Sequence, residues 1–212
     1  MRASFVTAGV FIALAIAACS STSNTTGGQG DSGGNGGGPT CEAYCTAIMA
    51  NCTSTTDPDS GLPVGNQQYT DMNNCLNSCK AMPVGTSADS SGNTLGCRLT
   101  HANLAKSDPA THCPHAGPGG AGTCGTNCDG FCQIAMMYCT AANMAAVFTS
   151  LQDCQTQCAA FPNDVKFNIG VQDGSSTACL LYHVQEASSV PPDHCLGDII
   201  KDDAGDKSTT CH

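Results

Sequence analysis

The sequence has little of what usually builds a large apolar core. It contains no Trp, and aromatic residues make up only 5% of its 212 residues. Buried aromatic and large aliphatic side chains supply much of the hydrophobic stabilisation of an ordinary domain. Their scarcity argues against a conventional core as the main source of stability. We expect covalent cross-links to take over that role, as in small domains that bury little apolar surface.

Positive charge is also scarce. Seven Lys and Arg residues stand against 17 Asp and Glu residues, which gives a formal net charge of −10. The basic residues are scattered along the chain, so they form no basic stretch. A negatively charged surface repels nucleic acid. We therefore expect no nucleic-acid partner.

Several catalytic and redox signatures are missing. The chain has no C-x-x-C pair, which argues against a thiol oxidoreductase, a zinc ribbon and a covalently attached haem. The sequence GDSGG at residues 30–34 matches the nucleophile motif of trypsin-like serine proteases. A Ser in such a Gly-rich stretch cannot be held against a catalytic base, and the family's His and Asp would have to lie upstream. We expect the protein not to be an enzyme.

Residues 1–18 have the organisation of an export signal. An apolar run from Phe5 to Ala18 follows a positive residue and is shorter than the ~20 apolar residues of a membrane-spanning helix. The run ends in IAAC at residues 16–19, which resembles the lipobox of bacterial lipoproteins. The resemblance implies removal of residues 1–18, a diacylglycerol on Cys19 and, because Ser20 follows, an outer-membrane location.

An ordinary export signal cut after Ala17 is the alternative. The cysteine count favours the lipobox, because 16 of the 17 cysteines remain to pair once Cys19 carries lipid. We therefore expect a protein anchored in the bacterial cell envelope, with the membrane as its partner through the lipid. Its orientation towards the periplasm or the cell surface stays open.

Residues 19–40 form the expected anchor and tether. Eight of the 21 residues from 20 to 40 are Gly, and most of the others are Ser, Thr or Asn. A Gly/Ser-rich chain of this length is a flexible coil with a span of about 25 Å. It would hold a folded domain away from the membrane.

An internal repeat begins at Cys41. Both copies contain C-x3-C-x6-C, then C-x3-C, then C-x15-C, and each has eight cysteines. The sequence YTDMNNCLNSCKAMP at 69–83 also aligns with FTSLQDCQTQCAAFP at 148–162. Such similarity indicates duplication of one structural unit. We expect two tandem helical repeats, at 41–124 and 125–212.

The cysteine spacing predicts helices. Cysteines four residues apart lie on one helix face, which predicts a first helix in each copy after Thr40 and Asn127 as N-caps. Second helices would surround the other C-x3-C pairs and end before Pro83 and Pro162. Third helices would span 94–105 and 176–187. The predicted fold class is all-α, small and disulfide-rich.

Two antiparallel C-x3-C helices can be joined by two disulfides, outer cysteine to outer and inner to inner. The predicted hairpin pairs are Cys41–Cys79, Cys45–Cys75, Cys128–Cys158 and Cys132–Cys154. This pattern resembles the twin C-x3-C hairpins of small mitochondrial intermembrane-space chaperones, over these eight cysteines alone. The other expected pairs are Cys52–Cys97, Cys113–Cys124, Cys139–Cys179 and Cys195–Cys211.

Two histidines occupy matched positions in each copy. His101 and His183 lie four residues after a Cys, and His112 and His194 directly precede one. Neutral imidazole is a common ligand, so these residues are candidate ligands of a metal ion or haem. The alternative is that each ring fills a gap and bonds to the backbone, with no cofactor. His115 and His212 have no counterpart in the other copy.

These observations predict a non-enzymatic, lipid-anchored module that binds an unknown protein or envelope partner. One alternative is an envelope protein for electron transfer or metal handling that uses the paired histidines. The other is a structural protein of the envelope.

Overall fold

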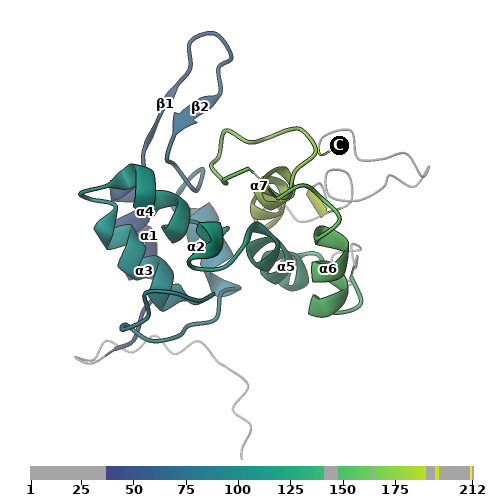
Figure 1. Ribbon diagram of the computed structural model, residues 1–212, viewed down its shortest axis with the longest axis horizontal. Helices are drawn as coiled ribbons and strands as arrows, with labels where there is room; N and C mark the ends of the chain where they lie inside the picture. Colours follow the sequence, from purple (N-terminus) through teal and green to yellow (C-terminus); the bar gives the residue numbers. More distant parts are fainter. Residues whose placement is uncertain (1–36, 141–147, 164, 190–193, 196–210, 212) are drawn as a thin grey trace, which may run out of the picture. The chain divides into compact units, whose positions relative to one another are not determined.

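The computed structural model describes residues 37–140, 148–163, 165–189, 194–195 and 211. In this part of the chain seven α-helices accompany one short 3-10 helix and one two-stranded sheet (Figure 1). The elements are α1 (Cys41–Asn51), β1 (Ser54–Thr56), β2 (Pro63–Gly65), α2 (Met72–Lys80), α3 (Leu95–Leu104), α4 (Pro109–Ala116), η1 (Gly120–Gly122), α5 (Asn127–Tyr138), α6 (Leu151–Cys158) and α7 (Thr177–Ala187). The predicted all-α, disulfide-rich fold is confirmed.

Side-chain caps explain where the predicted helices begin. The hydroxyls of Thr40, Thr94 and Ser176 each accept a hydrogen bond from the backbone N–H three residues on, at the start of α1, α3 and α7. Asn127 is not the cap of α5, contrary to the prediction. Thr126 takes that place in a capping box with Asp129.

The two predicted helical hairpins are held by two disulfides each. The structure joins α1 to α2 through Cys41–Cys79 and Cys45–Cys75, and α5 to α6 through Cys128–Cys158 and Cys132–Cys154. These are the pairs that the spacing predicts. In each pair the Cα atoms lie 5.7–5.8 Å apart, an ordinary disulfide separation.

The other four expected pairs differ from those in the structure. In the first copy we expected Cys52–Cys97 and Cys113–Cys124, but the structure has Cys52–Cys113 and Cys97–Cys124. In the second copy we expected Cys139–Cys179 and Cys195–Cys211, but the structure has Cys139–Cys195 and Cys179–Cys211. In the first copy the reason is α4, a helix that the cysteine spacing did not predict. It carries Cys113 to the C-terminal end of α1, where Cys52 lies. The second copy shows the same exchange.

Each copy has its own apolar cluster. In the first, Tyr44, Ile48 and Tyr69 are buried with the disulfide cysteines. The Tyr69 hydroxyl donates to the Tyr44 hydroxyl at 2.8 Å, and Tyr44 donates in turn to the Ala116 carbonyl at 2.7 Å. In the second, Phe131, Ile134 and Leu181 are the large members.

Polar side chains join the two copies along a contact between α2 and α7, which we call the polar seam. It consists of Gln68, Asn74, Asn77, Gln185 and Glu186. Asn74 donates to the Gln185 carbonyl at 3.0 Å, and Gln68 donates to the Phe167 carbonyl at 3.2 Å. Gln68, Asn74 and Gln185 are buried. The copies therefore meet through directed hydrogen bonds as well as through the apolar contact of Ala81.

Residues 35–212 form one compact unit. The expected boundary at residues 124 and 125 lies inside it, and the division into two repeat domains stays a prediction. Of the predicted tether, only residues 37–40 are described, and they are irregular. No helix in the described ranges combines the length and apolarity needed to cross a membrane.

Arg98 is buried without an acidic side chain among its hydrogen-bond partners. Its guanidinium donates to the carbonyls of Gly117, Pro118 and Thr94, at 3.1, 3.0 and 3.3 Å. Burial lowers the pKa of Arg98, although a guanidinium stays charged in proteins. Its counterpart in the second copy is Leu180, which is also buried. Arg98 thus ties the connection that follows α4, through the Gly117 and Pro118 carbonyls, to the start of α3 at Thr94.

The first prediction concerns the disulfide pairs of the first copy. We expect trypsin digestion of the urea-unfolded, non-reduced chain, with free thiols blocked, to leave peptide 81–98 linked to peptide 107–166 through Cys97–Cys124. Peptide 107–166 also carries the fragment ending at Lys80 through Cys52–Cys113 and peptide 167–201 through Cys139–Cys195, and the latter holds peptide 208–212 through Cys179–Cys211. Mass spectrometry should therefore find these five peptides in one adduct, and reduction should release them separately. A two-peptide adduct of 81–98 with the fragment ending at Lys80, lacking 107–166, would instead support Cys52–Cys97.

The second prediction concerns Arg98. Replacing it with the Leu of the second copy removes the donor of the Pro118 carbonyl, whereas the Gly117 and Thr94 carbonyls keep the backbone N–H groups of Gly120 and residue 98 as donors. We therefore expect Arg98→Leu to lower the free energy of unfolding by about 2 kcal/mol or more. Urea unfolding followed by circular dichroism, with disulfides intact, measures the change. Leu180→Met is the control and should cost less than about 1.5 kcal/mol. A change below about 1 kcal/mol for Arg98→Leu would contradict this role.

Candidate functional site

The structure brings the two predicted histidines of the first copy together. His101 lies on α3 and His112 on α4, and their Nδ1 atoms are 2.9 Å apart. The two ring centroids are 5.1 Å apart. His101 is buried, with 8% of its surface exposed, and His112 is half-buried. Two nitrogens at this distance share one proton in a hydrogen bond or face a common ligand.

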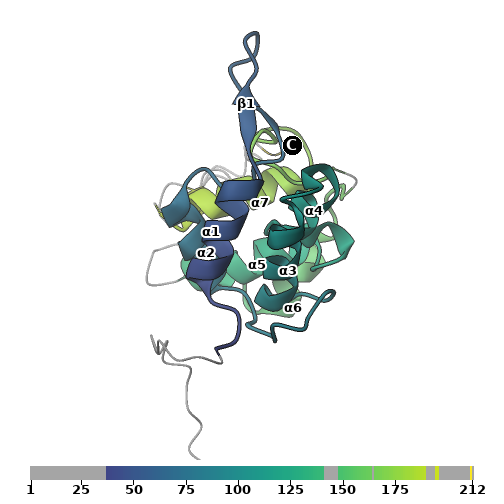
Figure 2. The same cartoon turned by 90° about the vertical axis from the view of Figure 1, so that its left-hand side faces the viewer.

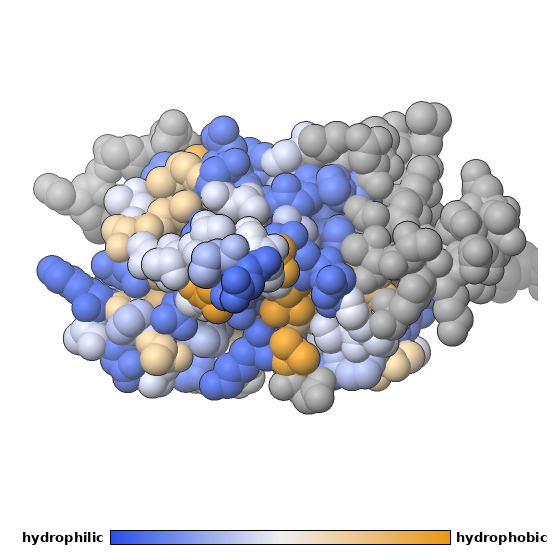
Figure 3. All heavy atoms as spheres, turned by 90° about the horizontal axis from the view of Figure 1, so that it is seen from above, coloured by the Kyte–Doolittle hydropathy of each residue, from blue (hydrophilic) through white to orange (hydrophobic). Residues whose placement is uncertain are grey.

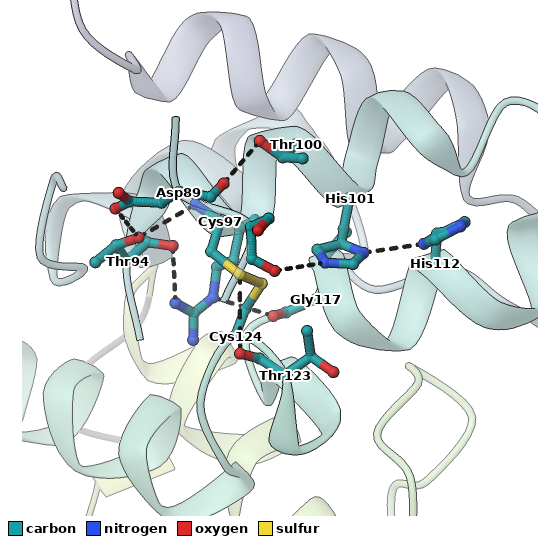
Figure 4. The surroundings of a disulfide bond; sticks show 12 residues. Asp89, Thr94, Cys97, Thr100, His101, His112, Gly117, Thr123 and Cys124 are labelled. Carbon is teal, nitrogen blue, oxygen red and sulfur yellow. Dashed lines mark hydrogen bonds between the residues drawn. A yellow bond between two sulfur atoms is a disulfide. The ribbon is translucent and has the colours of Figure 1, made fainter. Parts of the chain in front are cut away.

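A backbone carbonyl sets the tautomer of His101. Its Nε2 lies 3.2 Å from the Ser90 carbonyl oxygen. The other ring nitrogen, Nδ1, faces His112 (Figure 4). Because a carbonyl can only accept, the Nε2 atom carries the proton. In the neutral ring the Nδ1 atom therefore has a free lone pair directed at His112.

Asp89 holds the loop that carries this carbonyl. Its carboxylate accepts from the Thr86 hydroxyl at 2.6 Å and the Thr94 hydroxyl at 2.7 Å, and its carbonyl accepts from Thr100 at 2.9 Å. The Thr86 hydrogen bonds, and then the one from Thr94, lower the pKa of the Asp89 carboxyl. The ionised carboxylate thus ties the loop to the start of α3, next to His101.

The predicted histidines of the second copy are also neighbours. His183 lies on α7, and its ring centroid is 6.0 Å from that of His194. The Nε2 atom of His183 donates to the Gln172 carbonyl at 2.9 Å. In both copies the carbonyl that fixes the tautomer lies eleven residues before the histidine. The duplication therefore preserves the arrangement as well as the residue types.

A third ring joins the pair of the first copy. His115 lies three residues after His112 on α4, and its ring centroid is 4.9 Å from that of His101. The Nδ1 atom of His115 is buried and has no hydrogen-bond partner. Burial lowers the pKa of His115, and the nearby His101 and His112 lower it further. Below, His101, His112 and His115 are called the histidine cluster.

His115 has no counterpart in the other copy, so the repeat did not predict it as a candidate site residue. The signal that could have found it is the spacing H-x2-H at residues 112–115, which places two imidazoles on one helix face. That signal depends on recognising α4 as a helix. The unpredicted helix therefore explains both why His115 was not predicted and why the remaining disulfide pairs of the first copy were wrong.

Sulfur atoms lie close to His101 and His183 but are bonded to one another. Cys97 and Cys124 flank His101 within ligand distance, and Cys179 and Cys211 flank His183. Both pairs are disulfides (Figure 4). A disulfide lacks the thiolate that metal ions bind, so the histidines are the available ligands. The remaining predicted site residue, Cys19, lies outside the described residues.

The first copy is similar to a known protein family. Residues 39–127, less than half of the chain, match the model of the BfoA family C-terminal domain. The match encloses α1 to η1, and with them the histidine cluster and the β1–β2 hairpin. No solved structure matches the chain significantly.

Curated relatives come from Aspergillus fungi. The chain is 37% identical over 83 residues to aurasperone B biosynthesis cluster protein A of Aspergillus niger, which covers 39% of this chain and 27% of the relative. It is 37% identical over 91 residues to bifonsecin B biosynthesis cluster protein A of Aspergillus brasiliensis, which covers 41% of this chain and 30% of the relative. The chain thus spans under a third of the length of these relatives.

These matches contradict the identification of the chain as a bacterial lipoprotein, because the relatives are fungal cluster proteins. The expected location at a bacterial outer membrane is wrong for the same reason. The lipobox is a short pattern of small residues before a Cys. In a chain with 17 cysteines, an apolar run that ends at a Cys produces this pattern without the family.

Proposed function

We propose that this protein is a non-enzymatic binding module that recognises a partner protein through its β1–β2 hairpin. The observation that supports this proposal most directly is the position of the β1–β2 hairpin. It projects well beyond the helices of the described chain (Figures 1 and 2). Exposed loops on a rigid scaffold are where binding residues concentrate.

The hairpin is ordered by its own hydrogen bonds. The Asp57 carboxylate accepts from the backbone N–H groups of Asp59 and Ser60, at 3.0 and 2.8 Å, and from the Ser60 hydroxyl at 2.9 Å. Gly61 completes the turn with a φ of +70°, a backbone conformation that glycine adopts without strain. A partner would therefore meet a preformed loop, which reduces the entropy lost on binding.

The base of the hairpin is anchored to both copies. Thr53 and Ser54 accept from the backbone N–H groups of Asn66 and Gln67, at 3.1 Å each. The Gln67 carbonyl accepts from the N–H of Ile169 in the second copy, also at 3.1 Å. The tip is thus free while the base is fixed.

The hairpin exposes apolar side chains and unpaired strand edges. Leu62 and Val64 are 36% and 52% exposed. Among the described residues, β1 and β2 pair with each other alone, so each strand has one edge that pairs with no further strand. The face from which the hairpin rises is mostly hydrophilic, with apolar residues gathered near its middle (Figure 3). Such a surface suits an extended segment of a protein, bound by strand addition with apolar contacts.

Two further observations support a non-enzymatic accessory role. The guanidinium of Arg98 and the Nε2 atom of His101 donate to backbone carbonyls, which is a structural use of both buried side chains. The relatives are named biosynthesis cluster proteins. We therefore propose that the partner is a protein encoded in the same biosynthetic gene cluster as this chain.

The third prediction tests the hairpin. The full oxidised chain, immobilised, should retain a protein produced from the neighbouring genes of its own source. The double substitution Leu62→Ser and Val64→Ser should weaken that binding at least tenfold, about 1.4 kcal/mol, because both apolar contacts are lost. Surface plasmon resonance with the purified partner measures the change.

Val84→Ser is the matched control, since Val84 is 57% exposed but lies outside the hairpin. It should bind as the unchanged chain does. Equal binding by the hairpin variant and the unchanged chain would overturn the role of the hairpin. Failure of every cluster protein to bind would overturn the proposed partner.

A further inference from the structure

We propose that the histidine cluster of the first copy is a binding site for one divalent transition-metal ion of the zinc, copper and nickel group. This inference is independent of the hairpin and its partner. It concerns residues on α3 and α4, where His101, His112 and His115 converge from two helices (Figure 4 shows the first two).

The distances suit a shared ion. One ligand atom from each ring can be chosen so that all three lie within 4.8 Å of one another. Zn–N bonds of about 2.0–2.1 Å at tetrahedral angles place ligand nitrogens about 3.3 Å apart. The Nδ1 atoms of His101 and His112, at 2.9 Å, need to separate by only a few tenths of an ångström. The third nitrogen needs to approach by at most about 1.5 Å, which a half-buried side chain achieves by rotation.

The hydrogen bonds leave the required lone pairs available. Ser90 fixes the proton of His101 on Nε2, so the lone pair on Nδ1 can bind an ion in place of its hydrogen bond with His112. Metal-binding histidines typically donate their other N–H to a carbonyl or carboxylate in this way. The buried Nδ1 of His115 has no hydrogen-bond partner in the structure. A buried polar atom without a partner is destabilising, and a bound ion would satisfy it.

The ligand type selects the class of metal. Three imidazole nitrogens with no thiolate or carboxylate favour zinc, copper or nickel, whereas calcium and magnesium prefer oxygen. Three protein ligands leave a fourth position open, as in zinc sites that hold water or a small ligand. The 2.9 Å distance between the two Nδ1 atoms leaves no space for a porphyrin between them, so a metal ion fits this pair better than a haem.

The second copy provides an internal comparison. His183 and His194 repeat the pair and its carbonyl contact, but the residue aligned with His115 is Gly197, which has no side-chain ligand. Among the described residues, the second copy thus brings two imidazoles together where the first copy brings three. Because three imidazoles bind an ion more tightly than two, this comparison favours the first copy as the site.

The fourth prediction tests this site with Zn²⁺, which is redox-inactive and leaves disulfides intact. Isothermal titration of the untagged, oxidised full chain should give one tight site per chain. His112→Ala should weaken it at least 100-fold and His115→Gln at least tenfold, because each removes one ligand. His183→Ala, the matched control in the second copy, should change the affinity less than twofold.

Circular dichroism and a free-thiol count establish that each variant is folded and fully disulfide-bonded; should His112→Ala fail to fold, the half-buried His115→Gln provides the test. Absence of a tight site in the unchanged chain would overturn the proposal. So would unchanged affinity in His115→Gln. Two sites per chain, one of them lost in His183→Ala, would show that a histidine pair suffices and would overturn the role of His115.

Discussion

Disulfides between helices are the constraint on which the rest of this structure depends. The hairpins α1–α2 and α5–α6 are each closed by two bridges, and the remaining four attach the later segments of each copy to the earlier ones. Each bridge restricts the unfolded chain and typically contributes about 2–4 kcal/mol. The apolar clusters can therefore remain small, and polar groups such as Arg98 can be buried among them.

The two copies have kept their covalent framework and changed what surrounds it. Arg98, with its three carbonyl contacts, occupies the position of the apolar Leu180. His115 likewise stands where the other copy has Gly197. Because the bridges fix the backbone, such exchanges alter local chemistry without requiring a different fold. The first copy contains the β1–β2 hairpin and the histidine cluster, and it is also the part that the family match covers.

Local periodicity predicted much of the fold. Cysteines four residues apart predicted the first two helices of each copy and the disulfide pairs that join them. The third helices were predicted to start at Thr94 and Ser176, and the structure confirms these starts. The other pairs depend on where α4 packs, and its sequence PATHCPHA, with a Pro at its start and another inside, has no helical cysteine spacing. Because α4 was not predicted, His115 was not recognised as a neighbour of His112 on the same helix face. Only the pair His101–His112 could be recognised, because it recurs in both copies.

The polar seam has a consequence for how such a chain can evolve. The side-chain N–H groups of Gln68, Asn74 and Gln185 donate to backbone carbonyls across the seam, and the presence of these carbonyls does not depend on particular side chains. A unit without its neighbour would expose mainly amide groups there, which water solvates readily. Duplication of one unit could thus begin from a surface already compatible with solvent. The contacts could then be refined one substitution at a time, and units could be gained or lost between lineages without passing through an aggregation-prone intermediate.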